Sequence, residues 1–312
     1  MTSDVAHPRA RRIGRTLKLF LVDGSPTGVI TAELGNWSGK AIVAPRTALP
    51  ELIKREEALR TGVYLLMGAD PDNPARTLVY VGESDSVRTR LASHDSDDAK
   101  QFFTRVCLIV SKDENLTKAH VRYLESRIMA LIRQASRAVL VNGTDPDFKG
   151  LPEPEIADME GFLSEIEVLL PVLGFDVLRR AAESGDADGG RDAAEPVFLF
   201  TEAGTQARAK EAGGEFVVLA GSLARVKETQ TIHDGAKDQR RQLVEDGVFV
   251  KTEDGQHYTF TRDVAFSSPS GAAAVVYGGN VSGPAYWRRE GDGLTYKEWR
   301  QQQLVQAQGG AG

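Results

Sequence analysis

Two tyrosines in the first half of the chain stand where they could act together on a substrate. Tyr64 lies in the apolar run TGVYLLMG and Tyr80 in the apolar run LVYVG, and both runs are expected to be β-strands. Side chains alternate between the two faces of a strand, so antiparallel pairing of the runs brings Tyr64 and Tyr80 together on one face. Gly62 and Gly82, each two residues from a tyrosine, leave room there for a substrate backbone.

A carboxylate on the longest predicted helix, residues 115–136, is the second feature that could do chemistry. Glu125 shares a side of this helix with Val121 and Met129 and therefore lies at the edge of the face that packs on the sheet. A carboxylate among apolar neighbours needs a partner or a metal ion. An ion pair with Arg122, three residues away, is the alternative, and for Glu125 taken by itself it is the simpler explanation.

These residues belong to a series of short segments that resembles the GIY-YIG nuclease family. In chain order the segments are Gly62-Val63-Tyr64, Tyr80-Val81-Gly82, Val87-Arg88-Thr89-Arg90-Leu91, Tyr123-Leu124-Glu125 and Val141-Asn142-Gly143. Three-letter motifs occur by chance in many chains. Five elements in the right order, on the predicted strands and helices, make a much more specific match over about residues 60–145.

The resemblance implies a metal-dependent endonuclease that hydrolyses phosphodiester bonds in DNA. Glu125 falls on the family's ligand for Mg²⁺, or another divalent cation such as Mn²⁺, and Arg90 falls on the active-site arginine. Tyr64 and Tyr80 fall on the tyrosines that position or deprotonate the attacking water, and the sequence does not decide between them. Asn142 falls on the asparagine that helps to hold the site together.

The resemblance also implies roles for residues around this centre. His94 comes four residues after Arg90, where other members carry an aromatic residue or a histidine, and it could relay a proton. The alternative is an exposed histidine at the end of a helix. Gly62, Gly82 and Arg88 are expected to contact the substrate.

Physical chemistry agrees with these roles but raises one difficulty. Mg²⁺ is typically held by one or two carboxylates, with water and phosphate filling the remaining positions, and arginine can grip two phosphate oxygens at once. A free tyrosine has a pKa of about 10 and is a poor base unless its phenolate is stabilised. Excision-repair members have a lysine directly after the second motif, where this chain has Glu83. A catalytically weak module that binds DNA or protein is therefore the rival hypothesis.

The elements that must position these residues predict an α+β fold. We expect a small antiparallel three-stranded sheet flanked by helices, then a linker, then a second α+β module. The expected divisions are a flexible basic tail (1–15), a strand-rich extension with a helix over 50–60 (16–59), the nuclease-like domain (60–150), a helical segment and linker (151–196), a C-terminal module (197–300) and a frayed tail (301–312). Asn115 is the expected N-cap of the long helix.

The C-terminal module resembles a domain of unestablished function that often follows such nucleases. The resemblance rests on the segments 216–222 and 266–273 and on Trp287 and Trp299. Basic residues lie close to these tryptophans, and aromatic rings among basic residues can stack nucleobases and hold phosphates; the basic residues are Arg288, Arg289, Lys297 and Arg300. The alternative is that the tryptophans are core residues.

The amino-acid composition limits the class of protein and the cell compartment that we expect. Hydrophobic residues make up 41% and charged residues 26%, which suits a globular protein. No run approaches the roughly 18 apolar residues of a bilayer-crossing helix. The lone Cys107 excludes an intrachain disulfide, so we expect a cytoplasmic protein, and it leaves a thiol-based reductase as a third hypothesis. The net charge of −6 is unexpected for a protein that coats DNA, although it allows a local basic cleft.

Overall fold

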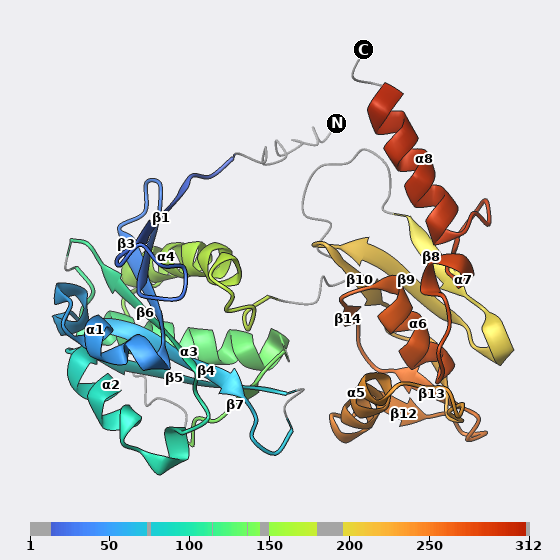
Figure 1. The fold of residues 1–312 in the computed structure, drawn as a ribbon, viewed down its shortest axis with the longest axis horizontal. Helices are drawn as coiled ribbons and strands as arrows, with labels where there is room; N and C mark the ends of the chain where they lie inside the picture. The colour runs from blue at the N-terminus through green and yellow to red at the C-terminus, as the bar shows by residue number, and fades with distance from the viewer. Residues whose placement is uncertain are drawn as a thin grey trace, which may run out of the picture. The chain divides into compact units, whose positions relative to one another are not determined.

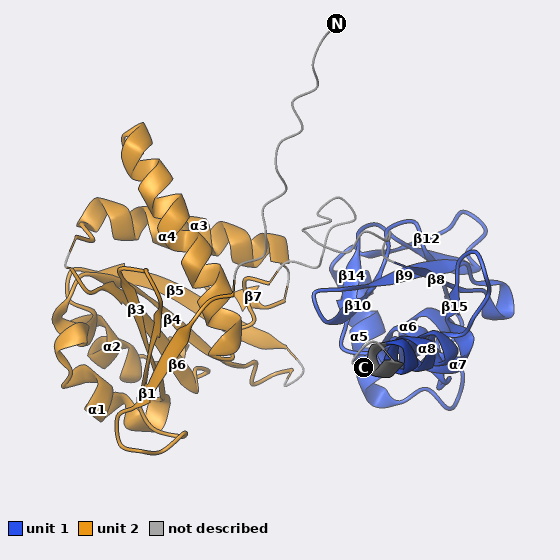
Figure 2. Cartoon of the chain, turned by 90° about the horizontal axis from the view of Figure 1, so that it is seen from above, with its two compact units in different colours: residues 1–12, 181–312 blue, residues 13–180 orange. Residues whose placement is uncertain are grey.

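The structure is a computed structural model that describes residues 14–73, 76–113, 115–135, 137–143, 150–179 and 196–309. These residues fall into an N-terminal unit, residues 14–179, and a C-terminal unit, residues 196–309 (Figure 2). Both units combine sheets with helices, so the fold class is α+β. Most of the expected tail, up to residue 13, and the expected linker lie outside the described residues. No described helix is long and apolar enough to cross a membrane.

The N-terminal unit is built on a seven-stranded sheet with the order β1-β2-β3-β6-β4-β5-β7 (Figure 1). Its strands are β1 (Leu17–Leu21), β2 (Ile30–Leu34), β3 (Gly39–Pro45), β4 (Gly62–Ala69), β5 (Thr77–Ser84), β6 (Arg105–Ser111) and β7 (Val139–Leu140). Only β5 and β7 pair in parallel. The sheet is therefore larger than the three strands expected. Strands from residues 16–59 belong to this same sheet, because β3 pairs with β6 along its whole length.

Helices cover both faces of this sheet. They are α1 (Leu49–Ile53) and α2 (Val87–Asp95) on one face, and α3 (Lys118–Ala135) and α4 (Glu153–Val172) on the other (Figure 2). Strand β4 is buried on both faces: Tyr64 and Leu66 pack with α1 and α2, whereas Val63 and Leu65 pack with α3 and α4. Strands buried on both faces carry nearly continuous apolar runs, which explains the sequence VYLLM.

The C-terminal unit contains a five-stranded and a three-stranded sheet, with the orders β14-β10-β9-β8-β15 and β11-β13-β12. The strands are β8 (Val197–Phe200), β9 (Ala207–Ala212), β10 (Glu215–Val218), β11 (Leu223–Arg225), β12 (Phe249–Lys251), β13 (His257–Phe260), β14 (Val264–Phe266) and β15 (Arg288–Arg289). The helices are α5 (Asp234–Glu245), α6 (Pro269–Tyr277), α7 (Gly283–Tyr286) and α8 (Tyr296–Gly309). Although β13 and β14 follow each other closely in the chain, they belong to different sheets.

The tryptophans of this unit are core residues. Trp287 is 0% exposed and Trp299 is 4% exposed, and both rings pack against phenylalanines of the five-stranded sheet. Of the basic residues nearby, Arg289 pairs with Asp292, and Arg300 lies 3.7 Å from Glu211. The expectation that the tryptophans stack nucleobases is therefore wrong, and the core alternative is confirmed.

Helices α3 and α8 both begin with a reciprocal pair of capping hydrogen bonds, and for α3 the cap differs from the expected one. In α3 the cap is Thr117 rather than Asn115: the Thr117 hydroxyl accepts from the main-chain N–H of His120, while His120 Nδ1 accepts from the N–H of Thr117. In α8, Thr295 and Glu298 form the equivalent reciprocal pair. Such capping boxes satisfy main-chain donors at a helix start. The segment 301–309, expected to be frayed, therefore continues a helix that begins at Tyr296.

The helix expected over 50–60 is in fact two pieces, α1 and the short 3₁₀ turn η2 (Glu56–Leu59). Arg55 interrupts the helix between them with an extended backbone, φ −72° and ψ 150°. Glu57, two residues after Arg55, is 7% exposed and turns its carboxylate into a network of charges. The charged contacts of Glu57 therefore replace the helical turn.

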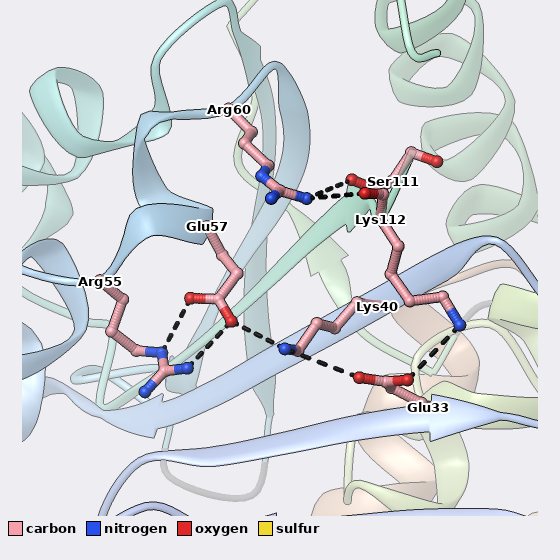
Figure 3. Close-up of polar contacts among 7 residues, drawn as sticks. All are labelled: Glu33, Lys40, Arg55, Glu57, Arg60, Ser111 and Lys112. Carbon is pink, nitrogen blue, oxygen red and sulfur yellow. Dashed lines mark hydrogen bonds and ion pairs between the residues drawn. The ribbon is translucent and has the colours of Figure 1, made fainter. Parts of the chain in front are cut away.

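Figure 3 shows how this network ties the segment before β4 to the sheet. Glu57 accepts hydrogen bonds of 3.0 and 2.9 Å from Arg55 and lies 2.8 Å from Nζ of Lys40 on β3. Lys40 is also 3.6 Å from Glu33 on β2. Arg60 donates to two main-chain carbonyls at the end of β6, at 3.0 and 3.2 Å. Burial by itself raises the pKa of Glu57, but the bonds from Arg55 and Lys40 outweigh it and lower this pKa to about 2.

We expect Glu57→Gln to lower the free energy of unfolding near neutral pH by about 2 kcal/mol, because the cations around Glu57 lose their buried counter-charge. The pKa of Glu57 is about 2 in the folded protein against an ordinary 4.5. Its stabilisation is therefore complete above the ordinary pKa and is lost as the pH falls toward the folded value. Urea unfolding at decreasing pH should show the wild type losing its advantage. The exposed neighbour variant Glu56→Gln is the control, and equal effects of the two substitutions would contradict the assignment.

Candidate active site

The register of β4 and β5 places the two tyrosines side by side. Tyr64 is opposite Gly82, and Leu66 is opposite Tyr80, so the tyrosines are diagonal neighbours on the α2-facing side of the sheet. Their ring centroids are 6.3 Å apart. Diagonal neighbours on one face of an antiparallel pair are within reach of aromatic side chains. The structure therefore brings Tyr64 and Tyr80 together in the way that strand alternation predicts.

The space beside the two glycines is filled by the protein itself. A Cβ atom on Gly82 would lie 2.5 Å from Cζ and Oη of Tyr64, and one on Gly62 would lie 2.6 Å from the carbonyl oxygen of Ile109. Both glycines are buried. The expectation that they leave room for a substrate backbone is therefore wrong: Gly82 makes room for the ring of Tyr64, and Gly62 makes room for strand β6.

His94 closes the group from the end of α2. It is 8% exposed, its Nε2 lies 2.8 Å from Oη of Tyr64, and its ring centroid is 5.1 Å from that of Tyr80. The alternative of an exposed histidine is therefore wrong. Burial, together with the positive charges of Lys100 and Arg90, lowers the pKa of His94 and favours the neutral ring. The sequence signal was its spacing, since His94 shares a helix face with the buried Leu91.

The two phenols differ in their access to solvent. Tyr64 is fully buried, whereas Tyr80 is half-buried. Burial raises the pKa of Tyr64 far above its ordinary value, and the nearby Tyr80 raises it further. Burial also raises the pKa of Tyr80, but the positive charge of Arg90 and hydrogen bonding to Tyr64 act in the opposite direction. Tyr80 is therefore the more solvent-accessible of the two phenols.

The two arginines of α2 have different environments. Arg90 is exposed and makes no hydrogen bond or ion pair within the described part of the chain. Its charge nevertheless acts on Tyr64, Tyr80 and Glu125 and lowers the pKa of each. Arg88, expected to contact substrate, instead donates from Nε to the carbonyl oxygen of Ile53 at 2.6 Å and ties α2 to α1. Arg90 thus keeps its guanidinium available, whereas Arg88 has a structural contact.

Glu125, on α3, is half-buried near these groups. Burial, and then the negative charge of Glu83, raise the pKa of Glu125 to about 7, against the lowering effect of nearby cations. Glu125 forms no hydrogen bond or ion pair with any residue that the structure describes. The alternative of an ion pair with Arg122 is wrong, because Arg122 lies 3.6 Å from Glu83 instead. Glu125 is therefore a half-buried carboxylate that has cations nearby but no direct ion-pair partner among the described residues.

Glu83 lies on the α3-facing side of β5, away from Tyr80. Neighbouring residues of a strand face opposite ways, and Val81 on the same side packs in the core with α3. The carboxylate of Glu83 is 2.6 Å from Nζ of Lys118 and 3.6 Å from Arg122, both on α3. Its charge is therefore balanced by that helix.

Asn142 holds the edge of the sheet beside this group. Its side-chain oxygen accepts from the main-chain N–H of Val81 at 3.0 Å, and its side-chain nitrogen donates to the carbonyl of Val81 at 2.7 Å. The amide thus continues the pairing of β7 with β5 by one more position. Asn142 thus supports β5 at Val81, the residue directly after Tyr80.

Sequence reasoning missed Lys100. Lys100 follows the acidic turn around Asp95, Asp97 and Asp98 and lies with Nζ 4.1 Å from the ring centroid of Tyr80. No local pattern could have revealed this contact, because tertiary folding of the α2–β6 connection brings Lys100 to β5.

The chemistry of the donors limits the candidate cofactors. No group of three or more His, Cys, Asp or Glu side chains that could hold a metal ion exists among the described residues. Glu125 with water and a phosphate fits a single hard cation such as Mg²⁺. Burial raises the pKa of Cys107 to about 12, so its thiol is protonated and enclosed, which argues against a thiol-based reductase.

Residues 198–300 match a family described as Domain of unknown function (DUF4357). This confirms the expected domain of unknown function in the C-terminal unit. No match to the GIY-YIG family is found, so the resemblance of residues 60–145 stays a prediction. No curated protein matches the chain, and no solved structure matches it either.

We expect Gly82→Ala to lower the free energy of unfolding by about 1–3 kcal/mol, because its methyl group overlaps the ring of Tyr64 in a packed core. The loss should shrink in a Tyr64→Leu background, which removes the atoms that the methyl group meets. Gly161→Ala is the matched control: nothing lies within 4 Å of its added Cβ, so in helix α4 it should be neutral or stabilising. Urea unfolding of the wild type, Gly82→Ala, Tyr64→Leu, the double variant and Gly161→Ala measures these effects. A loss that persists in full without the Tyr64 ring would contradict the explanation.

Proposed function

We propose that the N-terminal unit is a metal-dependent DNA endonuclease of the GIY-YIG type, with its active centre at Tyr64, Tyr80, Arg90, His94 and Glu125. One observation carries the proposal. Electrostatic coupling joins these side chains from β4, β5, α2 and α3, while Arg90 and Glu125 have no partner among the described residues. Structural charges are normally paired, so an unpaired cation and anion beside two phenols favour a site for a ligand that carries both phosphate and metal.

Glu125 is the residue that would hold the metal ion. A divalent cation there would offset the charge of Glu83 and the burial that raise the pKa of Glu125 to about 7. Mg²⁺ and Mn²⁺ accept one protein carboxylate, with water and phosphate oxygens as the other ligands. The bound ion supplies neutralisation of the charge on the phosphate. Glu83 is engaged by Lys118, so Glu125 is the one protein ligand that we propose.

Arg90 would hold the scissile phosphate. Its guanidinium is exposed and carries no described partner, and a guanidinium can donate two parallel hydrogen bonds to phosphate oxygens. Its influence on Tyr80 and Glu125 indicates that a phosphate bound there would also lie close to both. A lysine could replace the charge but not the two-pronged geometry.

Tyr80 is the general base that we propose, and Tyr64 and His94 support it through hydrogen bonds. Tyr80 is the more accessible phenol, and hydrogen bonding to Tyr64 counteracts the effect of burial on its pKa. With the proton on Nε2, neutral His94 donates to Tyr64 across 2.8 Å, and the Tyr64 hydroxyl is then free to donate to Tyr80. The buried pair would thus supply a hydrogen bond to the phenolate of Tyr80.

The reaction that follows is hydrolysis of a phosphodiester. The Tyr80 phenolate takes one proton from a water molecule, and the water oxygen forms a bond to phosphorus. The bond from phosphorus to the departing sugar oxygen breaks, and that oxygen takes a proton from solvent. Tyr80 returns its proton to solvent afterwards. Positioned proton transfer of this kind contributes typically about 100- to 10,000-fold to a rate.

The C-terminal unit has no step in this reaction. We propose that this unit, which matches a domain of unknown function, binds substrate or a partner. Because Trp287 and Trp299 are buried, such binding would use other surfaces of the unit. A buried and unpaired Cys107 supports a reducing compartment such as the cytoplasm.

Plasmid cleavage with Mg²⁺ tests the role of Glu125. We expect Glu125→Gln to reduce cleavage at least about 100-fold, because the neutral amide loses the charge that attracts the cation. Glu167→Gln, on the exposed face of α4, is the matched control and should cleave like the wild type. Equal cleavage by all three proteins would overturn the role of Glu125. Metal-independent DNA binding without cleavage, over a broad panel of substrates, would favour the rival hypothesis of a binding module.

The division of labour between the phenols gives a separate prediction. We expect Tyr80→Phe to reduce the rate of cleavage about 100-fold or more, since it removes the base. Tyr64→Phe removes only a hydrogen bond to Tyr80 and should cost about tenfold or less. Single-turnover cleavage with saturating metal measures both rates. A larger loss for Tyr64→Phe than for Tyr80→Phe would reverse the assignment.

A further inference from the structure

Lys100 is a cation beside the tyrosines to which the proposed reaction assigns no role. Its Nζ lies 4.1 Å from the centroid of the Tyr80 ring. The side chain is half-buried and forms no hydrogen bond or ion pair with the residues that the structure describes. The positive charge of Lys100 is therefore directed at an aromatic ring and is not neutralised by a carboxylate.

The loop that carries Lys100 is held in place by Arg46. Arg46 donates to the side chain of Asp95 at 2.9 Å and to the Asp95 carbonyl at 2.8 Å, before Lys100, and to the carbonyl of Gln101 at 3.3 Å, directly after it. Within the loop, the side chain of Asp97 caps the short turn η3 (Asp98–Lys100) by accepting a hydrogen bond of 3.0 Å from the main-chain N–H of Ala99. The backbone of Lys100 is thus anchored on both sides.

Several other groups act on Tyr80 from the surrounding elements. They are Tyr64 on β4, Arg90 and His94 on α2, Asp97 before η3 and Glu125 on α3. Two of them are negative and oppose ionisation of Tyr80, whereas Arg90 and the Tyr64 hydroxyl favour it. Lys100 differs from these groups because its positive charge lies over the face of the Tyr80 ring.

We propose that Lys100 is a positioning residue of this site, whose ammonium group favours the phenolate form of Tyr80. A cation within about 4–6 Å of an acid favours its charged form. The ring and oxygen of a phenolate carry the negative charge that this cation faces, so the attraction to Lys100 is stronger in the phenolate than in the phenol. The inference rests on the proposed role of Tyr80 as a base.

Titration of Tyr80 tests the proposal without requiring any nuclease activity. NMR of the full chain with isotope-labelled tyrosine, free of metal and DNA, follows each phenol as the pH rises; Tyr80→Phe identifies the signal of Tyr80. We expect Lys100→Met to raise the pKa of Tyr80 by about one pH unit, and Lys100→Arg to retain the wild-type value. Lys18→Met is the matched control. It removes an exposed lysine on β1, which is separated from β5 by the four strands β2, β3, β6 and β4, and it should leave the pKa of Tyr80 unchanged.

Cleavage provides the second measurement. Where Tyr80 is the base, Lys100→Met should cut about tenfold more slowly below the pKa of Tyr80 and recover as the pH rises, whereas Lys100→Arg should cut normally. An unchanged Tyr80 titration in Lys100→Met overturns the inference, and it does so even if DNA binding weakens, because Lys100 would then be a phosphate contact. A shifted titration supports it. Absence of cleavage by the wild type would overturn the nuclease function separately, since the titration does not depend on it.

Discussion

The pairing of β4 with β5 is the constraint on which the candidate site depends. With Tyr64 opposite Gly82, the Tyr64 ring occupies the space that a side chain on β5 would fill and lies beside Tyr80. A shift of β5 by one residue against β4 would send Tyr80 to the α3 side of the sheet and separate the two phenols. This register is held from both edges, by β6 along β4 and by Asn142 on Val81.

Burial divides the site into two layers with different chemistry. Tyr64 and His94 are enclosed, hydrogen-bonded to each other and held neutral by desolvation. Tyr80, Arg90 and Glu125 are half-buried or exposed. A hydrogen bond behind the reacting phenol costs nothing at the moment of reaction because it is already formed. The enclosed pair therefore suits a supporting role, and the outer residues suit contact with phosphate and metal.

Local patterns were sufficient where the chemistry depends on neighbours in the chain. Strand alternation predicted the facing tyrosines, and helix spacing placed Glu125 at an edge of α3. Contacts between distant segments were beyond their reach. The pairing of β3 with β6, the packing of Tyr64 over Gly82 and the approach of Lys100 to Tyr80 arise from tertiary folding. The spacing of Thr295 and Glu298 is a local signal in the sequence for the start of α8.

The acidic net charge is compatible with a nucleic-acid substrate if some cations near the site have no carboxylate partner and can bind phosphate. Lys118 and Arg122 are engaged by Glu83, whereas Arg90 and Lys100 have no carboxylate partner among the described residues. An unpaired cation acts on a phosphate with its full charge, whereas a paired one must first exchange its partner. What matters at the tyrosines is therefore the small number of available cations and not the charge of −6 summed over the chain. A divalent ion at Glu125 would add to them and would convert the one unbalanced carboxylate there from a repulsive to an attractive group for phosphate.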